Sequence, residues 1–197
     1  MSVEEHKITR TDIIDMAVYG EERQQRRSEI SQIKKNRRVH VGPDATFYFE
    51  SYDTMCYQVH EMLYIERGGE GQIGGELEAY NPLIPQGSEL IATLMIEIEN
   101  EDRRRETLAK LGGVEECLSI KIDGMIVKAV AERDLDRTTA AGKASSVHFV
   151  HFPFGGESIA AFRQDGAEVI VAIDHPAYSH MAKMTEETRA ALVQDFD

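Results

Sequence analysis

The chain has 197 residues, and its 42% hydrophobic content is enough to bury one good core, or one core and a smaller helical lobe. A formal net charge of −13 disfavours nonspecific attraction to nucleic acid or anionic membranes, which leaves proteins and small molecules as the expected partners. The longest apolar run, residues 90–96, is too short to span a bilayer, and the acidic start differs from a secretory signal, so we expect a cytoplasmic location.

The first 80 residues favour helices. Residues 11–38 contain no proline and predict one long helix or two short ones that break near Gly20. Residues 42–44 predict a turn, after which two further helices are expected over residues 51–67 and 72–80. Two prolines and a glycine in residues 81–87 predict a boundary between a helical lobe, residues 1–85, and an α+β domain, residues 86–197. One continuous globular domain is the alternative.

The second part of the chain predicts both strands and helices. Its clearest local pattern is a hairpin whose strands, residues 117–122 and 125–130, flank the favoured two-residue turn Asp123-Gly124. Three more strands are expected over residues 89–99, 147–152 and 168–174, and three helices over residues 101–111, 157–162 and 185–196. The predicted fold class is α+β, with an N-terminal helical lobe followed by a mostly antiparallel sheet of about five strands that has helices on one face.

The sharpest chemical signal is histidine. Four of the seven histidines, His148, His151, His175 and His180, fall within residues 145–154 and 173–180, two stretches that each predict a strand running into a proline-containing loop. If these strands pair, the imidazoles can meet at one end of the sheet and hold a transition metal or move protons. The two cysteines are far apart and form no C-x-x-C motif, so no cysteine-ligated site is expected.

This pattern predicts a site for iron, zinc or manganese. His151, His175 and His180 are its expected ligands, and His148 is a further candidate. Asp174 is expected to orient one of these rings by a hydrogen bond without binding the metal itself. Because side chains alternate along a strand, His148 and His151 can reach one ion only if the strand ends or bulges between them. The alternative is that His151 and His175 each hydrogen-bond a backbone carbonyl in a loop.

Two other segments are candidates for binding a ligand or partner. Residues 131–146 form a polar stretch long enough for a binding loop, where Arg137 and Lys143 could clamp an anion; an exposed turn is the alternative. The second helix carries Tyr57, His60 and Glu61 along a polar and aromatic stripe. This stripe lacks the Glu-x-x-His spacing of di-iron bundles, so a solvated or partner-facing surface is expected.

A basic run crosses the end of the first helix. Seven of the 22 basic residues lie within residues 23–38, and the last two of them are Arg37 and Arg38. Neither a helix-turn-helix pattern nor zinc-finger spacing accompanies the run, so nucleic acid is not the expected partner. An acidic protein, or the acidic surface of a second copy in a homodimer, fits better.

Several longer strings resemble a known family. Residues 35–50, 79–85, 136–146, 151–154 and 174–176 are similar to an uncharacterised bacterial family, domain of unknown function 3501, and the resemblance runs over nearly the whole chain. Members tend to be encoded beside rubrerythrin-like and heterodisulfide-reductase-like iron–sulfur proteins, so the resemblance implies a setting of redox or oxidative-stress handling and a redox protein partner. It carries over no catalytic residue.

Two classes of function follow, and the sequence leaves open whether the protein is an enzyme. The first is a redox accessory protein with a histidine metal site, in which the histidines converge on one ion. The second is a noncatalytic adaptor that docks an iron–sulfur or rubrerythrin-like partner, with separated, backbone-bonded histidines and an exposed patch on the helical lobe. A transcriptional regulator is a third reading, and it would require specific DNA binding at physiological salt.

Overall fold

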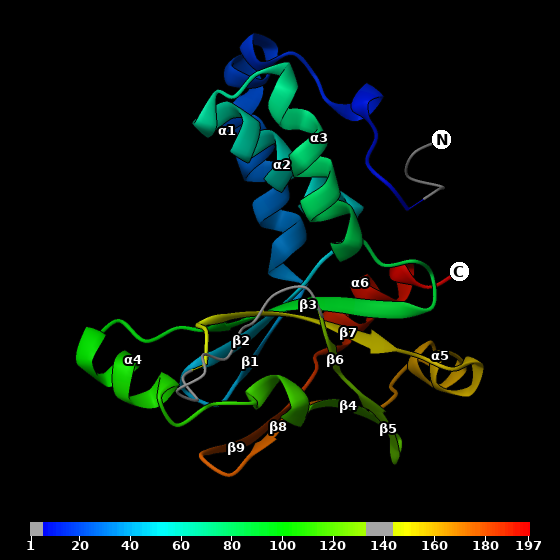
Figure 1. Cartoon of the computed structure of the whole chain (residues 1–197). Coiled ribbons are helices and arrows are strands. Elements are labelled where there is room, and N and C mark those ends of the chain that lie inside the picture. Colours follow the sequence, from blue (N-terminus) through cyan, green and yellow to red (C-terminus); the bar gives the residue numbers. More distant parts are fainter. Residues whose placement is uncertain (1–5, 133–143) are drawn as a thin grey trace.

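The protein consists of a helical lobe that stands on one side of two β-sheets (Figure 1). A computed structural model describes residues 6–132 and 144–197. The helices of the lobe are η1 (Arg10–Asp12), α1 (Met16–Lys35), α2 (Tyr52–Glu66), α3 (Glu70–Tyr80) and η2 (Asn81–Leu83).

Local signals in the sequence set the ends of these helices. The Asp15 carboxylate accepts a hydrogen bond from the Ala17 amide at 2.8 Å and caps α1, and the Ser51 hydroxyl accepts from the Thr54 amide at 3.3 Å and caps α2. Arg67 ends α2 in the left-handed conformation, with φ 56°. The helices expected over residues 51–67 and 72–80 are therefore confirmed as α2 and α3.

Sheet A is antiparallel, and its strand order in the described residues is β1-β2-β3-β7-β6. Its strands are β1 (Arg38–Val41), β2 (Ala45–Phe49), β3 (Glu89–Ile96), β6 (Val130–Ala131) and β7 (Val147–Pro153). Sheet B is also antiparallel, with the order β5-β4-β8-β9. Its strands are β4 (Leu118–Ile122), β5 (Met125–Lys128), β8 (Val169–His175) and β9 (Tyr178–Lys183).

The predicted hairpin is present as β4 and β5. Asp123 and Gly124 both have positive φ, 45° and 92°, as the tight turns that suit twisted hairpins require. Short helices border the strands: α4 (Glu101–Leu108), η3 (Val114–Cys117), α5 (Gly156–Phe162), α6 (Glu186–Leu192) and η4 (Val193–Asp195). No helix within the described residues is long and apolar enough to cross a membrane.

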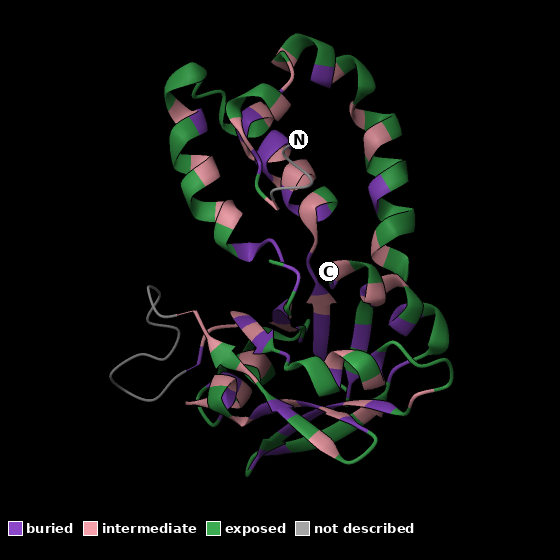
Figure 2. Cartoon of the chain, turned by 90° about the vertical axis from the view of Figure 1, so that its right-hand side faces the viewer, coloured by how far each residue is buried: buried purple, intermediate pink, exposed green. Residues whose placement is uncertain are grey.

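The two faces of sheet A meet two different hydrophobic clusters. Its inner face packs on sheet B, so that Phe47 and Phe152 share one core with Ile120 and Val171. Its outer face contributes Ile91 to a second cluster with the helices of the lobe. Figure 2 shows buried residues both in the sheets and along the inward sides of the helices. Sheet A is therefore the layer that joins the lobe to the rest of the molecule.

The α+β class is confirmed, but the arrangement of strands differs from the prediction in two respects. The expected strands divide between two sheets, because β7 pairs with β3 and β6 whereas β8 pairs with β4 and β9. In addition, β1 and β2 lie inside the segment read as helical, and they belong to sheet A. The boundary expected after residue 85 therefore cuts through a sheet.

Candidate functional site

The structure gives each C-terminal histidine its own partners. His148 lies on the inner side of β7, where its Nε2 is 2.9 Å from the Ser145 carbonyl oxygen. His175 ends β8, donates from Nε2 to the Gly112 carbonyl oxygen at 3.3 Å and accepts at Nδ1 from the Ala177 amide at 3.1 Å. The His180 ring on β9 meets the Tyr178 ring edge-on, with 4.5 Å between the ring centroids.

These positions do not support the predicted metal site. Among the described residues, no group of three or more histidine, cysteine, aspartate and glutamate side chains is arranged to hold a metal ion. The physical reason is the strand pairing, because His151 belongs to sheet A whereas His175 and His180 belong to sheet B. Asp174, expected to orient one of the rings, instead accepts a hydrogen bond of 3.5 Å from the Ser179 hydroxyl.

Among the four C-terminal histidines, His151 has the most polar contacts. Its Nδ1 lies 3.0 Å from a Glu89 carboxylate oxygen, and its Nε2 lies 2.8 Å from a Glu132 carboxylate oxygen. The hydrogen bond to Glu89, together with that to Glu132, raises the pKa of His151. The two carboxylates meet different ring nitrogens and so lie on different sides of the imidazole, which is the geometry of a charged hydrogen-bond relay and not of a chelate.

Glu89 and Glu132 were not candidates in the sequence. Glu89 begins β3 and Glu132 follows β6, and each of these strands pairs with β7. Because strand register decides which side chains become neighbours, nothing in the linear pattern links these two glutamates to His151. The predicted anion clamp of Arg137 and Lys143 lies outside the described residues.

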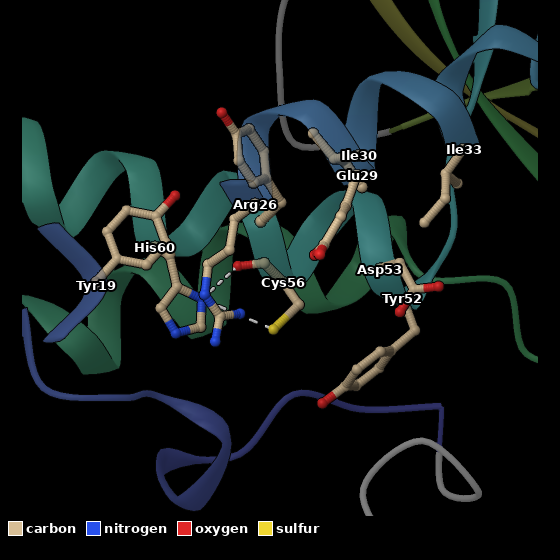
Figure 3. A pocket seen from close by; sticks show the side chains of 10 residues that line it. Tyr19, Arg26, Glu29, Ile30, Ile33, Tyr52, Asp53, Cys56 and His60 are labelled. Carbon is tan, nitrogen blue, oxygen red and sulfur yellow. Dashed lines mark hydrogen bonds between the residues drawn. The ribbon is translucent and has the colours of Figure 1, made fainter. Parts of the chain in front are cut away.

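The helical lobe holds a second candidate site, a groove between α1 and α2 (Figure 3). The groove has a volume of about 220 Å³ and is lined by aromatic, charged and apolar side chains. Those from α1 are Tyr19, Arg26, Glu29, Ile30 and Ile33, and those from α2 are Tyr52, Asp53, Cys56, Tyr57 and His60. The predicted basic helix and the predicted polar and aromatic stripe therefore face one another.

His60 is a structural residue at one end of this groove. Its ring is buried, donates from Nδ1 to the Cys56 carbonyl oxygen at 2.7 Å and accepts at Nε2 from the Ile14 amide at 3.2 Å. Burial lowers the pKa of His60, which favours the neutral ring that this pair of partners needs. The Tyr19 ring stacks on it at 5.1 Å between centroids. These contacts account for both ring nitrogens.

Cys56 lies beside His60 but is not an activated nucleophile. Its Sγ is 3.7 Å from His60 Nδ1, a nitrogen whose proton already goes to the Cys56 carbonyl oxygen. Burial raises the pKa of the Cys56 thiol to about 11, so the thiol is protonated at neutral pH. The groove therefore offers shape and polar contacts without a reactive thiolate.

Glu61 joins the two helices that form the groove. Arg23 donates to both carboxylate oxygens, with two bonds of 2.9 Å, and the Tyr19 hydroxyl donates at 2.7 Å. The hydrogen bonds from Arg23 lower the pKa of Glu61, and burial raises the pKa of Tyr19. Glu61 thus accepts hydrogen bonds from within the lobe, and these bonds hold α1 against α2.

The basic run separates into internal and exposed members. Arg37 is buried, donates to the carbonyl oxygens of Phe49 and Glu50 at 3.0 and 2.7 Å, and pairs with Asp195 at 2.5 Å. Arg27, Lys35 and Arg38 are exposed and form no ion pair with any described residue. The Lys34 ammonium lies over the Tyr57 ring, 5.9 Å from its centroid. Among the residues that the structure describes, Tyr57 and these exposed cations are therefore the predicted partner residues that remain accessible.

Comparison with known proteins assigns the chain to a family. The family described as protein of unknown function (DUF3501) matches residues 7–196. The chain belongs to this family. A crystal structure of a novel protein of unknown function from Burkholderia pseudomallei K96243 is similar to it, with 39% sequence identity and a TM-score of 0.90 over 97% of this chain and 100% of that chain. The curated proteins include no match.

Proposed function

We propose that this member of the DUF3501 family is a noncatalytic adaptor of a cytoplasmic redox or oxidative-stress system. In this proposal an acidic protein partner docks on the face of the lobe that α1 and α2 form. The observation that supports it most is the α1–α2 groove, which brings Tyr52, Tyr57, Arg26 and Ile33 together on one surface. Aromatic and arginine side chains next to apolar ones are the residues that contribute most to binding at protein interfaces.

The charge of the first helix supports an acidic partner. Residues 23–38 contain seven basic residues and a single acidic one, Glu29, in a chain whose net charge is −13. Arg27, Lys35 and Arg38 are exposed beside or beyond the groove and have no ion pair among the described residues. Opposite charge on a partner would speed encounter and fix its orientation. The acidic surface of a second copy, giving a homodimer, is the competing occupant.

A metal-dependent redox protein has less support. Of the histidines expected to hold iron, zinc or manganese, His148, His151 and His175 make separate hydrogen bonds to backbone atoms or glutamates. The fourth, His180, makes a ring contact with Tyr178. Metal analysis of anaerobically purified protein tests this alternative beside a His175→Ala/His180→Ala variant. Near-stoichiometric metal that disappears in the variant would replace the adaptor proposal with the metal-site proposal.

The docking test uses purified rubrerythrin-like and heterodisulfide-reductase-like iron–sulfur proteins, the partners that the family resemblance implies. We expect calorimetry or biolayer interferometry to detect binding of at least one of them, and the affinity to fall as salt rises. The variant Arg27→Glu/Lys35→Glu should weaken the binding about tenfold or more, since its new carboxylates repel an acidic partner that the wild-type cations attract.

The matched control is Lys110→Glu/Lys128→Glu, which changes the net charge equally at exposed positions away from the lobe. It should leave the affinity within about twofold of the wild type. Equal weakening by both variants would mean that net charge, and not the α1–α2 face, governs binding. Absence of binding to either iron–sulfur protein, together with a concentration-dependent dimer in sedimentation, would assign the face to a second copy.

A further inference from the structure

A second cavity lies between the helical lobe and the outer face of sheet A, and it is separate from the α1–α2 groove. Its volume is about 420 Å³, within the range of small-molecule sites. Its floor is formed by neighbouring strands, with Thr93 of β3 opposite both Tyr48 of β2 and Phe149 of β7. The lobe covers this floor, and Figure 1 shows the helices standing over sheet A.

Glu50, which follows β2, places a buried carboxylate at this cavity. The residue is 7% exposed and lines the cavity. One carboxylate oxygen accepts from the Thr93 hydroxyl at 2.6 Å, and the other accepts from the Thr54 hydroxyl at 2.7 Å. A carboxylate has about four acceptor positions, so these two hydroxyls orient the group and leave positions for a further donor.

None of the described cations neutralises this carboxylate. No lysine, arginine or histidine of the described residues lies within ion-pair distance of it. The nearby Arg37 donates to the Glu50 carbonyl oxygen and pairs with Asp195. Lys34 lines the cavity, but its ammonium lies over the Tyr57 ring. A buried carboxylate without a cation is costly, and a positively charged ligand would relieve that cost.

The other side chains that line the cavity suit a ligand whose positive charge is attached to an apolar body. Apolar or aromatic side chains form most of the wall: Tyr48, Met55, Tyr80, Leu83, Met95, Val147 and Phe149. Aromatic faces attract organic cations, and methionine adapts its shape to a ligand. The cavity thus combines one fixed negative group with a largely apolar wall.

We propose that this cavity binds a small organic amine in its ammonium form, with the ammonium at Glu50 and an apolar or aromatic body against Phe149 and Met95. Met55 and Gln58, which line the cavity, lie on the opposite side of α2 from Asp53, Cys56, Tyr57 and His60, which line the groove. The amine site and the proposed docking face therefore involve different residues. Either one can fail without the other.

The test titrates the full chain with 2-phenylethylamine and 4-phenylbutylamine, followed by calorimetry and ligand-observed NMR. The comparison ligand is 3-phenylpropan-1-ol, which has a similar body without the charge. We expect one of the amines to bind with a Kd of about 1 mM or below and the alcohol to bind at least tenfold more weakly. No binding of either amine up to about 10 mM, or equal binding of the alcohol, would overturn the proposal.

Three variants locate the binding. Glu50→Gln keeps the shape and removes the charge, and it should weaken amine binding at least tenfold. Glu157→Gln is its control, because Glu157 is exposed on α5 outside the cavity, and this variant should bind as the wild type does. Val147→Phe fills the cavity, leaves Glu50 unchanged and should also abolish binding.

A thermal melt of each variant separates loss of binding from loss of folding. Because Val147→Phe leaves Glu50 in place, it tests the site even if Glu50→Gln does not fold. Unchanged amine binding in both folded variants would show that the amine binds elsewhere.

Discussion

The partners of each imidazole nitrogen set the charge of that ring. His175 and His60 each donate from one nitrogen and accept a backbone N–H at the other, which only a neutral ring can do. His151 meets a carboxylate at both nitrogens, which only a doubly protonated ring satisfies fully. The hydrogen bonds from the His151 ring to Glu89 and Glu132 raise its pKa, so these two carboxylates favour the charged form of this ring.

The His151 pair of contacts predicts a stability that depends on pH. Its folded-state pKa is raised, chiefly by the hydrogen bond to Glu89, above the unfolded value of about 6.5. The stabilisation should therefore be fully present below about pH 6.5 and should be lost as pH rises through the folded-state pKa. Urea unfolding of the wild type and His151→Gln between pH 5.5 and 9 measures this.

The difference in unfolding free energy between the two proteins should be largest at the acidic end and should shrink towards pH 9. His180→Gln is the control, because His180 makes a ring contact with Tyr178 and no hydrogen bond to a carboxylate in the described structure. A difference for His151→Gln that grows with pH would contradict the charged relay.

At the scale of elements, the junction of α1 and β1 depends on one buried ion pair. Arg37 follows α1, binds the end of β2 through two carbonyl oxygens, and pairs with Asp195 in η4 near the end of the chain. Both side chains are less than a tenth exposed. This ion pair therefore joins the end of α1 to the C-terminal η4 at the point where the helical lobe meets sheet A.

Arg37→Met should lower the free energy of unfolding by about 3–5 kcal/mol, because it leaves the Asp195 carboxylate buried without its cation. Arg38→Met is the matched control at an exposed neighbour and should change that free energy by about 0.5 kcal/mol or less. Urea denaturation measures both, and Arg37→Met/Asp195→Asn should recover part of the loss. Equal effects at positions 37 and 38 would show that the ion pair does not stabilise the junction.

Patterns that are local in the sequence were predicted well. The caps of α2 and the Asp123-Gly124 turn depend on neighbouring residues, and both elements lie where expected. The β1–β2 hairpin was not predicted, although residues 38–41 and 45–49 flank a turn, because its strands are only four and five residues long and lie between two long helices. The histidine site could not be judged from the sequence, since it depended on β7 and β8 pairing, a choice made by the whole sheet.

At the scale of the whole molecule, sheet A supports two cores. Successive residues of β3 point to opposite faces, so Leu90 enters the cluster shared with sheet B while Ile91 enters the cluster of the lobe. The cavity with Glu50 and the His151 relay both lie on the outer face, on the side of the lobe. The lobe therefore depends on sheet A for its packing, and the candidate amine site depends on the lobe staying in place.

This arrangement predicts that substitutions at two adjacent and equally buried residues will speed hydrogen exchange in different parts of the molecule. Ile91→Ala and Leu90→Ala should each lower the free energy of unfolding by about 2–5 kcal/mol, since each leaves a cavity in a packed cluster. In hydrogen exchange followed by mass spectrometry, Ile91→Ala should speed exchange in α2 and α3 more than in β4 and β8, because it loosens the contact of the lobe with the sheet. Leu90→Ala should speed exchange in β4 and β8 instead. If both variants gave the same exchange pattern, the two clusters would be one cooperative unit, and the lobe could not open independently of the sheets to admit a ligand.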